Sequence, residues 1–252
     1  MTSSDLKNTE EQVPSTGGAG QLGWGRFTLQ FLTVVIAYIM AGIPAIAIWG
    51  ETSTGAAVSV ATSMAGGLFV SWLWLRADGA LGEAWNLRTP QSWPKTLLWA
   101  VIATIAIVIW FTVGAMLVEA AGFGLPDVEQ VIGWATENHF AFLMWIVLVA
   151  LFAAGLGEEL LWRGFLMDRL FRLPGLAGKM WPVILIQAAL FGLPHLYQGF
   201  GGVIITGVVG IGFGWLRLRF GGNLWACVLA HMAVDVLMLS LAYSEKLGLI
   251  AA

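Results

Sequence analysis

Seven long apolar runs constrain the fold of this chain more than any other feature. They lie at residues 27–49, 56–75, 97–118, 140–156, 181–197, 203–216 and 224–243. About 20 consecutive apolar residues form a helix long enough to cross the hydrocarbon core of a bilayer, and a helix satisfies its backbone hydrogen bonds within one segment. The runs therefore predict an all-α, polytopic membrane helix bundle with about seven transmembrane helices.

The composition agrees with a membrane protein and excludes several other classes. The chain of 252 residues is 58% hydrophobic and 11% charged, whereas soluble domains carry about 25% charged residues. No basic patch with interleaved aromatic residues is present, so we expect no nucleic-acid partner. Cys227 is the single cysteine, which excludes a disulfide framework and a cysteine metal cluster.

The runs divide the chain into three regions. Residues 1–22, rich in Ser, Thr, Glu, Gln and Gly, are predicted to be a disordered cytoplasmic tail. Residues 23–139 hold the first three transmembrane helices, and residues 140–245 form the transmembrane core that carries the candidate catalytic residues. With seven spans, only Lys246 of the 12 Lys and Arg residues falls on the C-terminal side. The positive-inside rule then puts the N-terminus in the cytoplasm and the C-terminus outside, and we expect a bacterial inner or cell membrane.

A charged motif, Gly157-Glu158-Glu159-Leu160-Leu161-Trp162-Arg163-Gly164, follows the fourth apolar run. Charged side chains inside a membrane are costly and usually functional. In an α-helix, Glu159 and Arg163 are four residues apart on one face, where a carboxylate reaches a guanidinium. Glu158 is rotated about 100° away. The spacing predicts one paired glutamate, Glu159, and one working glutamate, Glu158.

Two later runs also contain ionisable side chains. His195 follows Pro194 near the end of the fifth run, and His231 and Asp235 are four residues apart in the seventh. Each could simply be a hydrogen-bonding group that fastens two helices. Taken together, acid and base side chains from three spans favour one shared polar intramembrane cavity. A carboxylate and two imidazoles in such a cavity can activate water or bind a metal.

These residues resemble the three motifs of the CPBP family of intramembrane proteases, which includes CAAX-protease-like (Rce1-type), bacteriocin-processing and Abi proteins. The motifs are Glu158-Glu159-x-x-x-Arg163, Phe191-x-x-x-His195 and His231-x-x-x-Asp235. The similarity covers about residues 140–243, and the first three spans match only in being membrane helices. The third motif of the family more often ends in Asn, so Asp235 is a departure. An ionised Asp accepts hydrogen bonds but cannot donate one.

The resemblance implies an endopeptidase that cleaves a peptide bond of a membrane-associated protein or peptide. In this hypothesis Glu158 is the general base that activates a water molecule, with help from His195. His231, oriented by Asp235, polarises the scissile carbonyl or stabilises its oxyanion. Glu159 and Arg163 form a supporting pair. We expect no required cofactor, and membrane lipid as a partner.

Other readings remain open from the sequence. Glu158, His195, His231 and Asp235 could instead be ligands of Zn²⁺ with a water site left open, although no HExxH motif is present. The protein could be a non-catalytic immunity or partner-binding membrane protein. Its ionisable residues could also line a proton or ion pathway. A eukaryotic relative would cleave a prenylated CAAX protein, but the substrate of this chain cannot be read from its sequence.

Overall fold

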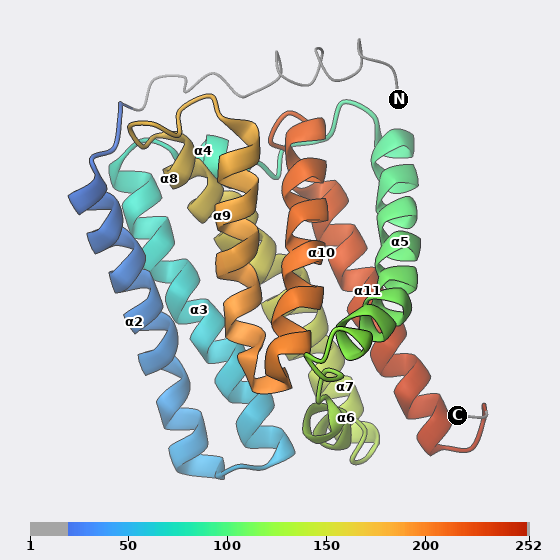
Figure 1. Cartoon of the computed structure of the whole chain (residues 1–252). Coiled ribbons are helices and arrows are strands. Elements are labelled where there is room, and N and C mark those ends of the chain that lie inside the picture. The colour runs from blue at the N-terminus through green and yellow to red at the C-terminus, as the bar shows by residue number, and fades with distance from the viewer. Residues whose placement is uncertain (1–19, 251–252) are drawn as a thin grey trace.

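The computed structural model describes residues 20–250, which contain helices and no β-strand (Figure 1). The helices are α2 (Trp24–Trp49), α3 (Ser53–Ala77), α4 (Leu81–Ala84), α5 (Trp93–Ala120), α6 (Glu129–Ala135), α7 (His139–Met144), η1 (Trp145–Leu166), α8 (Met167–Phe171), α9 (Met180–Gly192), η2 (Leu193–Gln198), α10 (Gly199–Arg219) and α11 (Trp225–Lys246). The predicted all-α polytopic bundle is confirmed. The predicted tail lies outside the described residues except for residues 20–22.

Six helical segments in the described range are long and apolar enough to cross a membrane, where the sequence predicts about seven. The difference lies in the fifth and sixth runs, which fall within one helical segment of 40 residues, Met180–Arg219. This segment turns back on itself, so that α9 and α10 lie side by side (Figure 1). The protein is therefore an integral membrane protein, and α2 begins at the opposite end of the bundle from the end of α11.

Pro194 and Gly199 explain why this hairpin turns where it does. Pro194 lies in the first turn of η2, a 3₁₀ helix, and proline lacks the N–H needed inside an α-helix. Gly199 follows with φ 83°, a conformation that favours glycine. His195 therefore lies in the turn of the hairpin. The loop before α6 contacts this turn, because Asp127 N donates to Gln198 O at 3.0 Å.

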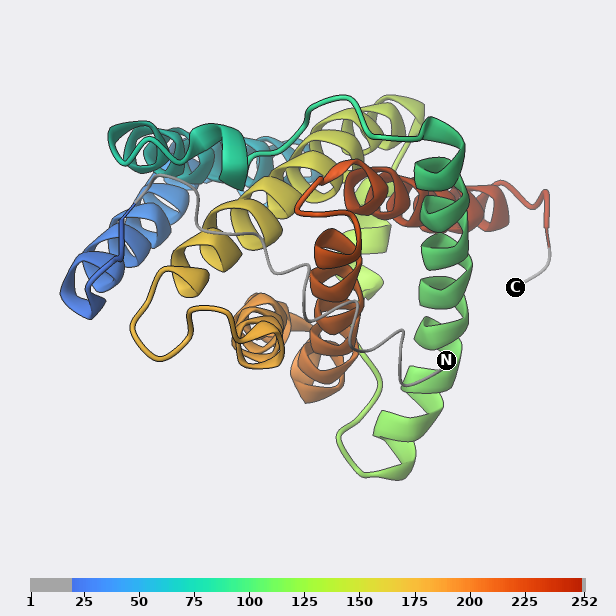
Figure 2. The same cartoon turned by 90° about the horizontal axis from the view of Figure 1, so that it is seen from above.

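The helix η1 lies at the centre of the bundle, in contact with α3 and α11, while α2 and α5 lie at opposite edges (Figure 2). Two glycines of η1 allow this close packing. A Cβ atom at Gly155 would overlap Met232 of α11, and one at Gly157 would overlap Met64 of α3. Small residues of this kind let membrane helices approach closely. They also fix how η1 is rotated relative to its neighbours.

The outer faces of α2 and α5 are apolar and exposed. Their large exposed side chains include Ile36, Ile43, Val101, Ile105 and Ile109. Extensive apolar surface is uncommon on soluble monomers and suits contact with lipid. The polar side chains that concern function lie instead between the helices.

An ion-pair network joins α2, α3, α4 and α8 at the end of the bundle where α2 begins. Arg169, fully buried, lies 2.6 Å from both Asp78 and Asp168. Asp168 also pairs with Arg172 at 2.9 Å, and Arg172 O accepts a hydrogen bond from Leu22 N. Leu22 is buried, so the chain is already packed against α8 before α2 begins. The other two members of the network are Arg26 and Glu83.

Candidate active site

The charged motif lies on η1, which is a π-helix, with backbone hydrogen bonds from residue i+5 to residue i. Short π-helical segments in proteins occur frequently at functional sites. A backbone carbonyl of the motif also accepts a side-chain hydrogen bond, since Trp85 Nε1 donates to Leu160 O at 2.9 Å. Gly164 lies against Trp85, which a Cβ atom at this position would crowd. These contacts hold the motif in one rotation within the bundle.

Glu159 and Arg163 form the pair that their spacing predicts. Arg163 Nη1 lies 3.0 Å from Glu159 Oε1, and both side chains are 0% exposed. The guanidinium of Arg163 also lies between two rings, 4.0 Å from the centroid of Phe191 and 5.0 Å from that of Phe213. Cation–π contacts of this kind strengthen when the cation is removed from water. Arg163 thus ties η1 to α9 and α10.

His231 connects this pair to the second glutamate. Its Nδ1 atom lies 2.8 Å from Glu159 Oε1. Because Glu159 is ion-paired with Arg163 and can only accept, Nδ1 of His231 carries the proton of this hydrogen bond. The other ring nitrogen, Nε2, lies 3.9 Å from Glu158 Oε2. The two consecutive glutamates of η1 therefore meet the same imidazole at its two nitrogens.

Asp235, which we expected to orient His231, lies close to the ring without a hydrogen bond to it. Asp235 Oδ2 lies 3.8 Å from His231 Nε2, which is within ion-pair range but too long for a hydrogen bond. The two residues share a face of α11 as predicted, yet the ring is held by Glu159 from another helix. Asp235, with 29% of its side chain exposed, faces the same nitrogen as Glu158.

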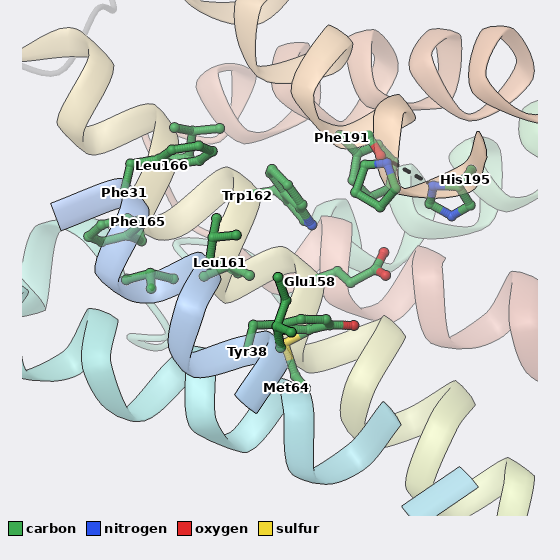
Figure 3. Close-up of a pocket in the computed structure, with 14 residues that line it drawn as sticks. Phe31, Tyr38, Met64, Glu158, Leu161, Trp162, Phe165, Leu166, Phe191 and His195 are labelled. Carbon is green, nitrogen blue, oxygen red and sulfur yellow. Dashed lines mark hydrogen bonds between the residues drawn. The ribbon is translucent and has the colours of Figure 1, made fainter. Parts of the chain in front are cut away.

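His195 reaches the site from η2. Its Nδ1 atom lies 3.2 Å from Phe191 O. A carbonyl only accepts, so Nδ1 is the donor, and Nε2 of the neutral ring remains an acceptor. In the part of the chain that the structure describes, no hydrogen bond or ion pair joins His195 to Glu158 or His231. His195 and Glu158 instead line the same pocket (Figure 3).

The side chains proposed as zinc ligands do not form a ligand set in this geometry. Between residues 20 and 250, no group of three or more His, Cys, Asp and Glu side chains is arranged to hold a metal ion. Zinc ligands lie about 2.0–2.3 Å from the metal. Glu158 and Asp235 face Nε2 of His231, whereas Nδ1 of that ring is already bonded to Glu159.

The pocket has a volume of about 290 Å³ and lies between α2, α3, η1 and the α9–η2 segment. Glu158 and His195 are at one part of it, and apolar side chains of η1 such as Leu161, Phe165 and Leu166 line the rest (Figure 3). Glu158 is 22% exposed in its side chain, in contrast to the fully buried Glu159. Glu158 is thus the glutamate that a molecule in the pocket would contact.

The motifs did not indicate that α2 forms a wall of this pocket. Five side chains of α2 line it: Phe31, Val34, Val35, Tyr38 and Ile39. None belongs to a charged or histidine-containing motif, so no local pattern marks them. Their position depends on how α2 packs against α3, which only the tertiary structure shows.

Comparison with known proteins agrees with the resemblance seen in the motifs. Residues 140–237 match the family model described as Rce1-like, type II CAAX prenyl endopeptidase. No curated protein and no solved structure matches the chain. The matched segment contains the three motifs, whereas α2, α3 and α5 lie before it. Residues 140–237 of this integral membrane protein are therefore similar to the Rce1-like family of CAAX intramembrane proteases.

Proposed function

We propose that this protein hydrolyses a peptide bond by means of a water molecule activated by Glu158. The observation that supports this most directly is the arrangement around His231. Glu159 holds Nδ1 of the ring, which directs Nε2 toward Glu158 Oε2 at a distance of 3.9 Å. A carboxylate and an imidazole nitrogen beside an apolar pocket are suited to general acid–base catalysis on a bound peptide.

In the proposed reaction, the Glu158 carboxylate takes a proton from water as the water oxygen attacks the scissile carbonyl carbon. The carbonyl π-bond opens, and its electron pair becomes the oxyanion. His231, in its cationic form, donates Nε2–H to that oxyanion. The tetrahedral intermediate then collapses, the C–N bond breaks, and the proton held by Glu158 passes to the leaving amine. The products are a carboxylic acid and an amine, and Glu158 returns to its carboxylate form.

The other polar residues of the site have supporting roles in this proposal. His195, whose Nε2 can accept a hydrogen bond, orients the water molecule from the same part of the pocket as Glu158. Glu159 and Arg163 fix the tautomer and position of the His231 ring. Asp235 stabilises the imidazolium through its charge. Carboxylate partners of this kind commonly fix the orientation of a working histidine.

The proposed substrate is a membrane-associated protein or peptide with an apolar group next to the scissile bond. The apolar lining of the pocket supports this, because it can bury such a group. The family description names prenyl endopeptidases, so a peptide with a prenylated cysteine in a C-terminal CAAX sequence is the first substrate to test. An unmodified peptide with apolar side chains at the same positions is the matched comparison.

We also propose an orientation with the N-terminus in the cytoplasm of a bacterial cell. The end of the bundle where α2 begins carries most basic residues of the described range, including Arg26, Arg76, Arg88 and Lys95. The end where α11 finishes carries Lys246. This distribution agrees with the positive-inside rule.

Replacement of Glu158 by Gln tests the proposed reaction. Gln has nearly the same shape but cannot take a proton from water, so we expect kcat to fall about 10²–10⁴-fold. The measurement is cleavage of an internally quenched farnesylated CAAX peptide by purified protein in lipid vesicles, with thermal unfolding of both proteins as the folding control. Cleavage by E158Q at the wild-type rate, with normal insertion and folding, would refute the assignment and favour a different or non-catalytic function.

The zinc alternative is tested with the same peptide. If Glu158 acts on water directly, preincubation with 1,10-phenanthroline leaves the cleavage rate unchanged. Loss of activity that Zn²⁺ restores would show that the four candidate ligands bind a metal during catalysis. A membrane protease with a known zinc site serves as the positive control for the chelator.

A further inference from the structure

The helix α2 lies outside the segment that matches the protease family, yet it forms one wall of the pocket that contains Glu158. Among its five pocket side chains, four are hydrocarbon and one, Tyr38, carries a hydroxyl group. Figure 3 shows the hydroxyl end of Tyr38 and the Glu158 carboxylate in the same part of the pocket. Tyr38 is therefore the polar group that α2 adds to the site.

The hydroxyl of Tyr38 differs from those of the other two tyrosines of the chain. Tyr197 accepts a hydrogen bond from Gln198 Nε2 at 2.8 Å, and Tyr243 is hydrogen-bonded to His139. Tyr38 has no hydrogen-bond partner among residues 20–250, although its side chain is partly buried. The hydroxyl oxygen is not fully buried in the protein. The free O–H group of Tyr38 is thus available to a molecule that enters the pocket.

Glycine contacts hold Tyr38 in this position. A Cβ atom at Gly67 of α3 would lie 3.4 Å from both Cβ and Cδ2 of Tyr38, so the tyrosine packs directly on this glycine. One turn earlier on α3, Met64 packs on Gly157, the residue before Glu158. The helix α3 therefore sets the position of Tyr38 relative to Glu158. The arrangement is part of the packed core rather than a chance contact of an outer helix.

A bound peptide needs a donor at this place. A peptide carbonyl that enters an apolar pocket loses its hydrogen bonds to water, which is costly unless a donor replaces them. The Glu158 carboxylate can only accept hydrogen bonds, and the hydrocarbon side chains of α2 have no hydrogen-bond donor. Tyr38 supplies an O–H group at the boundary between the apolar lining and Glu158.

We propose that Tyr38 is a substrate-positioning residue: its hydroxyl donates a hydrogen bond to a backbone carbonyl of the peptide next to the scissile bond, and its ring separates the apolar lining from Glu158. This inference rests on the proposed function of Glu158. It assigns α2 a direct part in choosing which peptide bond lies at the catalytic carboxylate.

The test compares Y38F, Y38A and the control variant Y243F with the wild-type protein, on the quenched farnesylated CAAX peptide in vesicles. Loss of one hydrogen bond predicts that Y38F lowers kcat/KM about 3- to 10-fold, with an unchanged melting temperature and an unchanged pH–rate profile. Y38A also loses the ring, so we expect a larger fall and additional cleavage at neighbouring bonds, detected by product mass. Y243F removes a tyrosine hydroxyl away from the pocket and keeps the wild-type kcat/KM.

The results for Y38F and E158Q distinguish the role of Tyr38 from the proposed function of Glu158. If E158Q is inactive and Y38F cleaves like the wild type at the same bond, Tyr38 does not position the substrate although the catalytic assignment stands. A shift of the pH–rate profile in Y38F would show that the hydroxyl acts on Glu158 instead, which overturns the inference. An active E158Q refutes the proposed function itself.

Discussion

Glu159 Oε1 lies 2.8 Å from His231 Nδ1 and 3.0 Å from Arg163 Nη1. One carboxylate oxygen thus joins an arginine of its own helix to a histidine of α11. The pair on η1 does more than hold the helix, because it also fixes the ring that faces Glu158. Glu159, paired with Arg163, and Glu158 therefore both lie next to His231.

This relationship predicts how variants of Glu159 and Arg163 change the stability of the protein. Both side chains are fully buried, so E159Q or R163M alone leaves one buried charge unpaired, which costs about 3–5 kcal/mol. The double variant E159Q/R163M removes both charges and should recover most of that loss. Thermal unfolding in detergent measures all four proteins.

In these four proteins, we expect the cleavage rate to follow a different pattern from the melting temperature. The double variant lacks the ionic partner of His231, so we expect its cleavage rate to remain at least about 10-fold below the wild-type rate, because a hydrogen bond to a charged group contributes about 1.5–3 kcal/mol. Recovery of both stability and activity would mean that Glu159 and Arg163 only fasten the helices.

Asp235 offers a second prediction. No hydrogen bond joins it to His231, and its side chain is 29% exposed. Partly exposed charge pairs contribute about 0–1 kcal/mol, so D235N should keep kcat within about 5-fold of the wild-type value. H231A, assayed on the same peptide, is expected to lose activity. If D235N is as inactive as H231A, then Asp235, and not Glu159, orients the ring.

Gly157 gives a prediction about packing beside Glu158, the proposed catalytic carboxylate. A Cβ atom there would overlap Met64 Cγ, and overpacking of this kind costs about 1–3 kcal/mol. G157A should therefore lower both the melting temperature and the cleavage rate, because Glu158 is the next residue. Adding M64A makes room for the new methyl group, so the double variant should be more stable than the sum of the two single effects predicts. Strict additivity would show that the two residues are not in contact.

The ion-pair network predicts a contrast between two arginines that share Asp78. Arg169 is fully buried, whereas Arg26 is 54% exposed. R169M removes the buried guanidinium that contacts both Asp78 and Asp168, while Arg26 and Arg172 remain as their partners. Hydrogen bonds to charged groups contribute about 1.5–3 kcal/mol, so we expect R169M to destabilise the protein by about that amount. R26M removes an exposed pair, worth about 0–1 kcal/mol. Denaturant unfolding of the two variants measures the difference, and equal effects would contradict the assigned burial of Arg169.

Much of the architecture was predictable because membrane helices are marked by the length and apolarity of single segments. The prediction was weakest at 181–197 and 203–216, which form one interrupted helical segment that folds back as a hairpin. Pro194 indicated a bend, but the reversal also needs Gly199, the first residue of α10, with its φ of 83°. The pairing of Glu159 with Arg163 was predictable as well, because residues four apart on one helix meet whatever surrounds them.

The partners of His231 could not be predicted in the same way. Its spacing from Asp235 is local and visible in the sequence, whereas its bond to Glu159 spans 72 residues. The wall of the pocket formed by α2 could not be predicted for the same reason, since its four hydrocarbon side chains and one tyrosine belong to no sequence motif. Whether Glu158 and His195 line one pocket likewise depends on how η1 packs against the hairpin.

The sequence by itself therefore determined that this is a polytopic helical membrane protein with ionisable residues on three spans, because helix length, apolarity and i, i+4 spacing are properties of single segments. Only the tertiary structure decided which residues act together. It brought Glu158 and Glu159 to the two ring nitrogens of His231 and put Tyr38 and Glu158 in one pocket. The reason is that contacts between helices depend on close packing at glycines, such as that of Met64 on Gly157, which sets the position of each helix relative to the next.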